Sequence, residues 1–230
     1  MARSGNKRFA RMTVDILLAV ILVLVMATAL VEEAPHEFLG IALIVLMCVH
    51  LVLNRRWFAT LARGRWSALR VIRAIVIVGL VACLVGQAVS AVILSKHALA
   101  FLPALPGTAI ARQAHMLCSY WMFAFAAAHA GLQMRSVFTS GRIRTMQPAA
   151  RIAVYALVAV VAALGVISFV QLNLPAYLTG SVQFAAGMPN VLLACALWTA
   201  AGVFVAVIFH ALRVALGRKP NRADSQTPGT

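Results

Sequence analysis

Long apolar segments constrain the fold of this chain more than any other feature. They come in unbroken runs of about 20 residues, the length of a helix that crosses the hydrocarbon core of a bilayer. Hydrophobic residues make up 63% of the chain and charged residues 11%, whereas a soluble domain is about half apolar and a quarter charged. This composition excludes a water-soluble globule, and the absence of short alternating segments excludes a membrane β-barrel. We therefore predict an all-α integral membrane protein.

The apolar runs predict a bundle of six transmembrane helices. Their approximate ranges are 12–31, 36–53, 71–94, 110–132, 152–170 and 191–212. The corresponding organisation is a basic N-terminus (1–11), a four-helix core (12–132), a loop with two further helices (133–212) and a disordered tail (213–230). The segments between the spans are too short to hold a soluble domain.

Basic residues predict the orientation of this bundle. Of the 20 lysines and arginines, all but Lys96 and Arg112 fall on one side of a six-span arrangement, and the other side carries Glu32, Glu33 and Glu37. Because Lys and Arg are enriched in cytoplasmic loops, both termini are expected in the cytoplasm. The net charge of +15 is thereby interpreted as topology and attraction to anionic lipid, and no nucleic-acid partner is expected.

Four of the six histidines lie in or at the ends of two apolar spans, where ionisable side chains are rare and mark functional sites. Fourteen residues separate His36 from His50, and fourteen also separate His115 from His129. On a helix, 14 residues return to within about 40° of the same face and rise about 21 Å. Each span therefore presents one histidine near each membrane surface, on one face.

The topology predicts which histidines face each other. Both spans run from outside to inside, so His36 and His115 share an outer depth, while His50 and His129 share an inner depth. Two imidazoles that face each other across a helix pair can ligate a haem iron axially. The sequence therefore predicts two b-type haems, an outer one held by the first pair and an inner one held by the second.

Residues near these histidines suit a flat macrocycle. Gly40 and Ser119 each follow an outer histidine by four residues, and a small side chain one turn along lets a porphyrin approach the backbone. Arg112 precedes His115 by nearly one turn and is expected to neutralise a propionate of the outer haem. The residues expected to serve the inner haem are Asn54, Arg55 and Arg135.

Other polar residues are interpreted structurally. Asp15 is expected to pair with Arg8 or Arg11, and the four cysteines, which form no CxxC pair, are read as buried small hydrophobes. His97 is expected to be exposed in a loop and Tyr177 to lie in an interfacial aromatic belt.

The histidine helices resemble a known family. The stretch Pro35-His36-Glu37-Phe38-Leu39-Gly40, followed by Val49-His50-Leu51 and Asn54-Arg55-Arg56-Trp57, resembles bacterial flavinylation-associated cytochrome domains. The helix with His115 and His129 is similar to their second histidine helix. The resemblance covers about residues 12–132, extends to cytochrome b and ferric reductase-like transmembrane domains, and implies electron transfer across a bacterial inner membrane to an extracytoplasmic, flavin-carrying partner.

The resulting functional hypothesis is a di-haem cytochrome that passes electrons between a quinol or cytoplasmic flavoprotein donor and an extracytoplasmic acceptor. Such a chain would be the membrane subunit of an oxidoreductase. Two alternatives stay open: a haem-free, proton-coupled transporter, and a membrane anchor for a redox complex. The transporter predicts further polar residues in the spans, but the two histidine spans are otherwise nearly all apolar.

Overall fold

The computed structural model describes residues 2–28, 33–56, 66–103, 105–134, 145–182, 184, 188 and 190–217, with side chains from Phe9 onward. All regular secondary structure in these ranges is helical, which confirms the predicted class. The helices are α1 (Ala2–Thr28), α2 (Glu33–Leu53), α4 (Ala68–Leu94), α5 (Thr108–Gln133), α8 (Pro148–Gln171), the short α9 (Leu174–Leu178) and α10 (Val191–Gly217).

Among the described residues, five helices are long and apolar enough to cross a membrane: α1 from Phe9 onward, α2, α4, α8 and α10. The chain is therefore a multi-pass membrane protein. The helix predicted as the fourth span, α5, is 26 residues long but is not among the five. Polar side chains such as Arg112, Gln113 and His115 interrupt its apolar sequence.

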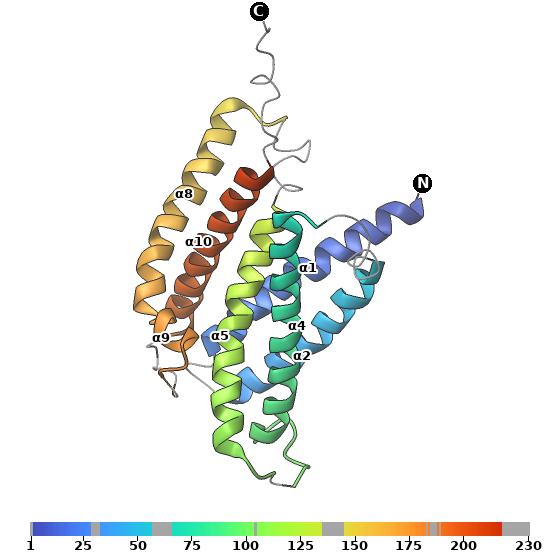
Figure 1. The fold of residues 1–230 in the computed structure, drawn as a ribbon, viewed down its shortest axis with the longest axis vertical. Coiled ribbons are helices and arrows are strands. Elements are labelled where there is room, and N and C mark those ends of the chain that lie inside the picture. The colour runs from blue at the N-terminus through green and yellow to red at the C-terminus, as the bar shows by residue number, and fades with distance from the viewer. Residues whose placement is uncertain are drawn as a thin grey trace, which may run out of the picture.

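The long helices form one bundle in which α5 is central (Figure 1). Helix α5 packs against α4 on one side and α10 on the other, α8 packs against α10, and α1 packs against α2 and α10. The α1–α2 pair crosses the other helices at a slant. The start of α1, the start of α4 and the end of α10 lie toward the same end of the bundle, at the top of the view.

Close approach of α5 to α10 depends on a glycine. A Cβ atom added at Gly131 would lie only 2.1 Å from the carbonyl oxygen of Ala206, so no side chain fits there without separating the helices. Gly165 likewise allows α8 to approach α10 closely. A Cβ atom added at Gly165 would lie 2.2 Å from the carbonyl oxygen of Ala200. Small residues at these contacts are typical of helix packing in membranes.

An aromatic cluster fills the space between α5, α9 and α10. Tyr120 stacks on Tyr177 with ring centroids 4.1 Å apart, and Trp198 contacts both Tyr120 and Phe123. Tyr177 is 4% exposed, and its hydroxyl donates to the carbonyl of Phe184. The prediction that Tyr177 belongs to an interfacial belt is therefore wrong, because α9 turns this side chain into the core.

Several predicted boundaries differ from the helices observed. Helix α1 begins at Ala2, within the predicted N-terminal segment, and α10 continues to Gly217, into the predicted tail. Residues 218–230 lie outside the described residues, as do Glu32 and Arg135. The short helix α9 was not anticipated. Of the cysteines, Cys83 is buried as expected, while Cys48 is exposed on α2.

Candidate bis-histidine site

The four candidate histidines lie on α2 and α5, whose backbones are not closely packed against each other in the described part of the chain. Helix α2 is held by α1 and touches α4, whereas α5 is held by α4 and α10. The facing side chains of α2 and α5 therefore meet across a wider separation than that of packed neighbours. Such spacing is what a flat group held between two helices needs.

The structure brings the histidines together in the predicted pairs. The ring centroids of His36 and His115 are 6.0 Å apart, and those of His50 and His129 are 6.4 Å apart. The rings are steeply inclined, at 73° and 82° respectively, and all four side chains are partly buried. One pair therefore lies near each end of the α2–α5 interface.

These separations match two imidazoles on opposite sides of one metal ion. Metal–imidazole bonds are about 2.0–2.1 Å long. With ring bonds near the roughly 1.33 Å of a conjugated C–N bond, a ring centroid lies about 1.1 Å behind its ligating nitrogen. Two imidazoles on opposite sides of one metal ion then have centroids about 6.2–6.4 Å apart. Both observed distances lie within about 0.5 Å of that range, so the residues present fit a haem iron.

The outer pair has its ring orientation fixed by hydrogen bonds. The Nδ1–H of His36 donates to the carbonyl of Val25 at 3.0 Å. Nδ1 of His115 lies 3.1 Å from the hydroxyl of Ser90, which itself donates to the carbonyl of Gly86 and so accepts from the imidazole. With the proton on Nδ1, Nε2 keeps the lone pair that a metal requires.

In the inner pair, His50 is held by a carboxylate. Its Nδ1 lies 2.9 Å from Oδ1 of Asp15 on α1, and the two side chains are 22% and 56% exposed. The predicted partner of Asp15 was an arginine, but Arg11 instead donates to the carbonyl of Leu53 at 2.8 Å. The side chain of Arg8 lies outside the described residues. The carboxylate of Asp15 is therefore bonded to the His50 ring and not to an arginine.

A basic residue that the sequence analysis missed lies near the inner pair. Arg73, one turn into α4, interacts electrostatically with His129, and its buried Nε has no hydrogen-bond partner in the described structure. An unpaired guanidinium N–H is suited to a carboxylate. Sequence reasoning passed over Arg73 because it looked for propionate partners in the adjoining loops.

Of the residues predicted to serve the inner haem, Asn54 donates a hydrogen bond from its side-chain amide to the carbonyl of His50 at 2.9 Å. Arg55 is exposed. The Nδ2 atom of Asn54 also lies 3.5 Å from Nε2 of His50, and Arg135 lies outside the described residues. Arg73 is accordingly a described basic residue whose charge acts on the inner pair.

Three further residues were assigned to the outer pair. A Cβ atom added at Gly40 would meet nothing within 4 Å, so open space lies in front of this glycine. The Ser119 hydroxyl donates to the carbonyl of His115 at 2.7 Å and is contacted by the amide of Gln87. Arg112 is exposed, with its guanidinium 5.8 Å from the ring centre of Phe184.

A carboxylate clamp that was not predicted fixes the start of α2. Glu37, next to His36, accepts four hydrogen bonds of 2.7–3.0 Å from the turn that follows α4. The donors are the Ser95 hydroxyl and the backbone N–H groups of Lys96, His97 and Ala98. The Lys96 ammonium also pairs with Glu33 at 2.9 Å. His97 is exposed as predicted, and the clamp ties His36 to the α4–α5 pair.

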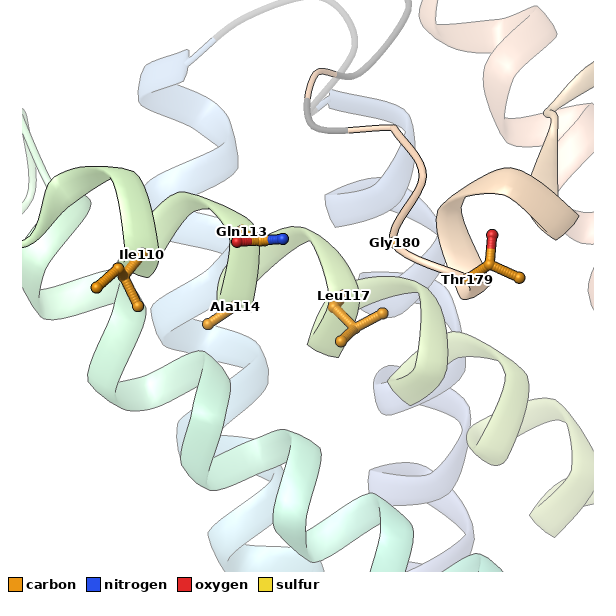
Figure 2. A pocket seen from close by; sticks show the side chains of 6 residues that line it. All are labelled: Ile110, Gln113, Ala114, Leu117, Thr179 and Gly180. Carbon is orange, nitrogen blue, oxygen red and sulfur yellow. The ribbon is translucent and has the colours of Figure 1, made fainter.

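A groove of about 330 Å³ lies between the start of α5 and the end of α9 (Figure 2). It is lined by Ile110, Gln113, Ala114, Leu117, Thr179 and Gly180. Because Ala114 directly precedes His115, the groove and the outer pair share the same turn of α5.

No family model, curated protein or solved structure matches this chain. Within the described residues, no three His, Cys, Asp or Glu side chains gather as a metal-binding group. The candidate site consists of two imidazoles at each end of one helix interface. Its function is therefore argued from this geometry.

Proposed function

We propose that the chain is a di-haem b-type membrane cytochrome that transfers electrons across a bilayer. The observation that carries the proposal is the double pairing of imidazoles, at 6.0 Å for His36 with His115 and 6.4 Å for His50 with His129. Chance packing of four histidines would not be expected to give two pairs with the same metal-compatible separation. The open space at Gly40 supports room for a macrocycle beside the outer pair.

In this proposal, the histidines, their hydrogen-bond partners and two arginines have separate roles. The four histidines would hold the two haem irons, and the Nδ1–H groups of His36, His115 and His50 donate to Val25, Ser90 and Asp15, which keeps Nε2 of these three rings in the form that can bind a metal. Arg73 and Arg112 are placed to neutralise propionates at the inner and outer ends. Each haem would supply reversible one-electron exchange when bound.

The proposed topology has six spans with both termini in the cytoplasm of a bacterial inner membrane. Helix α5, the fourth span along the chain, completes the six, and its His115 and Ser119 side chains form hydrogen bonds within the bundle. The one-sided distribution of Lys and Arg supports the orientation. The two pairs then lie about 21 Å apart along the membrane normal, which gives a path through most of the apolar layer.

Partner molecules must donate electrons at one end of this path and accept them at the other. The donor is a quinol or a cytoplasmic flavoprotein, and the acceptor is an extracytoplasmic protein that carries flavin. The resemblance of residues 12–132 to flavinylation-associated cytochrome domains supports the acceptor. The groove beside the outer pair offers it an open surface. This chain would then act as the membrane subunit of an oxidoreductase.

A second candidate function, haem-free proton-coupled transport, is favoured by one observation. The carboxylate of Asp15 and the ring of His50 form a hydrogen-bonded pair within two apolar helices, and such pairs occur in proton relays. The two functions differ in cofactor content. A transporter of this kind would be colourless after purification.

Measurement of haem content tests the proposal directly. The full chain should be purified in detergent from haem-replete cells and assayed as its pyridine haemochrome. We expect about two haems per chain and a low-spin spectrum on reduction. A variant with all four histidines changed to alanine should bind none. A colourless wild-type preparation would rule out the cytochrome and leave the transporter.

A further inference from the structure

Three of the four candidate ligands have a hydrogen-bond partner at Nδ1 in the described structure, and the three partners are not equivalent. At the outer pair, Nδ1 of His36 faces a backbone carbonyl and Nδ1 of His115 faces a hydroxyl, both neutral groups. At the inner pair, Nδ1 of His50 faces the carboxylate of Asp15 at 2.9 Å. The outer and inner pairs therefore differ in the charge of their hydrogen-bond acceptors.

A carboxylate acceptor changes the ligand as well as its orientation. Hydrogen bonds to an ionised acceptor are roughly twice as strong as neutral ones, and they raise the basicity of a ligating histidine. A more basic ligand and a nearby negative charge both stabilise the oxidised, more positive form of a bound metal. Both effects lower its reduction potential.

Arg73 opposes Asp15 at the inner pair but does not outweigh it. Both charges act on His129, and the effect of Asp15 is the larger. At the outer pair, Arg112 is exposed beside Phe184. Glu37 neighbours His36 in the chain, but its oxygens accept four hydrogen bonds from the turn after α4. Among the described residues, Asp15 is the carboxylate bonded to a candidate ligand ring.

We infer that Asp15 is a positioning residue that gives the inner site the lower reduction potential, so that electrons pass from the inner to the outer pair. This inference rests on the proposed function and names the residue whose charge favours electron transfer toward the extracytoplasmic acceptor. One electron leaves the inner site, which is oxidised, and the same electron reduces the outer site. With the proposed topology, electrons are exported from the cytoplasmic to the extracytoplasmic side.

Redox titration of the purified full-length protein, followed by absorbance, tests the inference. Wild type should show two potentials, with the lower one belonging to the haem that His50→Ala removes. Asp15→Asn should raise that potential enough to change the electron equilibrium between the sites about tenfold, equivalent to about 59 mV for one electron. The potential of the outer site should stay unchanged.

Three further variants separate charge from packing. Asp15→Glu keeps the carboxylate and should retain a potential close to wild type. Asp15→Ser provides a second neutral substitution, in case the asparagine variant does not fold, and should raise the inner potential in the same way. Ser90→Ala is the matched control at the outer pair and should leave the inner site unaffected. The electron paramagnetic resonance signal of the oxidised inner site should move in the Asp15→Asn and Asp15→Ser proteins alone.

The results distinguish this inference from the proposed function. Suppose that wild type binds two haems, but neutral substitutions at Asp15 leave the inner potential unchanged or move both potentials equally. The inference about Asp15 then fails, while the proposed cytochrome function is retained. It also fails if the inner site of wild type has the higher potential. If wild type binds no haem, the proposed function itself fails.

Discussion

The rings of His36 and His115 lie with their centroids 6.0 Å apart, although the backbones of the helices that carry them are not closely packed in the described structure. This relationship repeats at the other end of α2 and α5, where His50 faces His129. Two paired imidazoles at each end of these helices provide two places where a metal-centred flat group would be held.

The pairing makes a prediction for single substitutions. His36→Ala and His115→Ala should remove or alter the same haem, while His50→Ala and His129→Ala should affect the other, because each haem loses one of its two axial ligands. Haem content should fall from about two to about one per chain, or one site should become five-coordinate. Absorbance spectra and haemochrome assays of the four variants provide the comparison. Matching spectral losses from His36→Ala and His129→Ala would contradict the pairing.

Arg112 should affect only the outer site. If its guanidinium neutralises an outer propionate, Arg112→Gln removes a nearby cation and makes reduction of that haem less favourable. We expect a lower outer midpoint potential and an almost unchanged inner one, since the two sites are about 21 Å apart along the helix. Redox titration measures both values in one experiment. Equal shifts at both sites, or none, would remove Arg112 from the outer site.

Arg73 should affect only the inner site. Its buried Nε has no partner in the described structure, and its charge acts on His129. Arg73→Gln should therefore lower the inner potential and increase the loss of inner haem on dilution or warming. Arg70→Gln is the matched control, because the Arg70 guanidinium lies 5.3 Å from the ring centre of Trp66 at the start of the same helix. An effect of the same size from both variants would indicate a general loss of basic charge.

The Glu37 clamp should stabilise the outer end of α2. An uncharged amide cannot replace a carboxylate that accepts four hydrogen bonds, so Glu37→Gln should lower the thermal midpoint by a few degrees and release the outer haem first. Glu33→Gln removes only the exposed pair with Lys96 and should change the midpoint less, since exposed ion pairs contribute little. Thermal unfolding followed by haem absorbance separates the two variants. Equal midpoints for both would show that the clamp does not hold the site.

The sequence could predict the four histidines and their pairing because helical geometry leaves little choice. Two spans with the same 14-residue spacing that run in the same direction must place their histidines at matching depths. The partners of Nδ1 could not be predicted in this way. They come from α1 and α4, as Val25, Asp15 and Ser90 do, and their placement depends on how whole helices pack. Asp15 in particular has arginines nearby in sequence, but its observed partner is 35 residues away.

The burial of Tyr177 shows a second limit. Its neighbours Pro175 and Thr179 are typical of a loop between helices. A single turn of helix, α9, nevertheless directs the ring onto Tyr120. Short helices of this kind have too little periodicity to be recognised before the bundle around them is known.

Two glycines on the histidine helices should respond in opposite ways to substitution. Gly131 is in contact with the backbone of Ala206, so Gly131→Leu should separate α5 from α10 and prevent stable folding. Gly40 faces open space, so Gly40→Leu should leave the fold and thermal midpoint of the haem-free protein nearly unchanged. In haem-replete cells, however, the added side chain should occupy the position of the macrocycle and reduce the outer haem to well below one per chain. Haem content, measured beside the yield of folded protein, distinguishes these results. Normal outer haem in a folded Gly40→Leu protein would mean that the macrocycle does not lie against this face of α2.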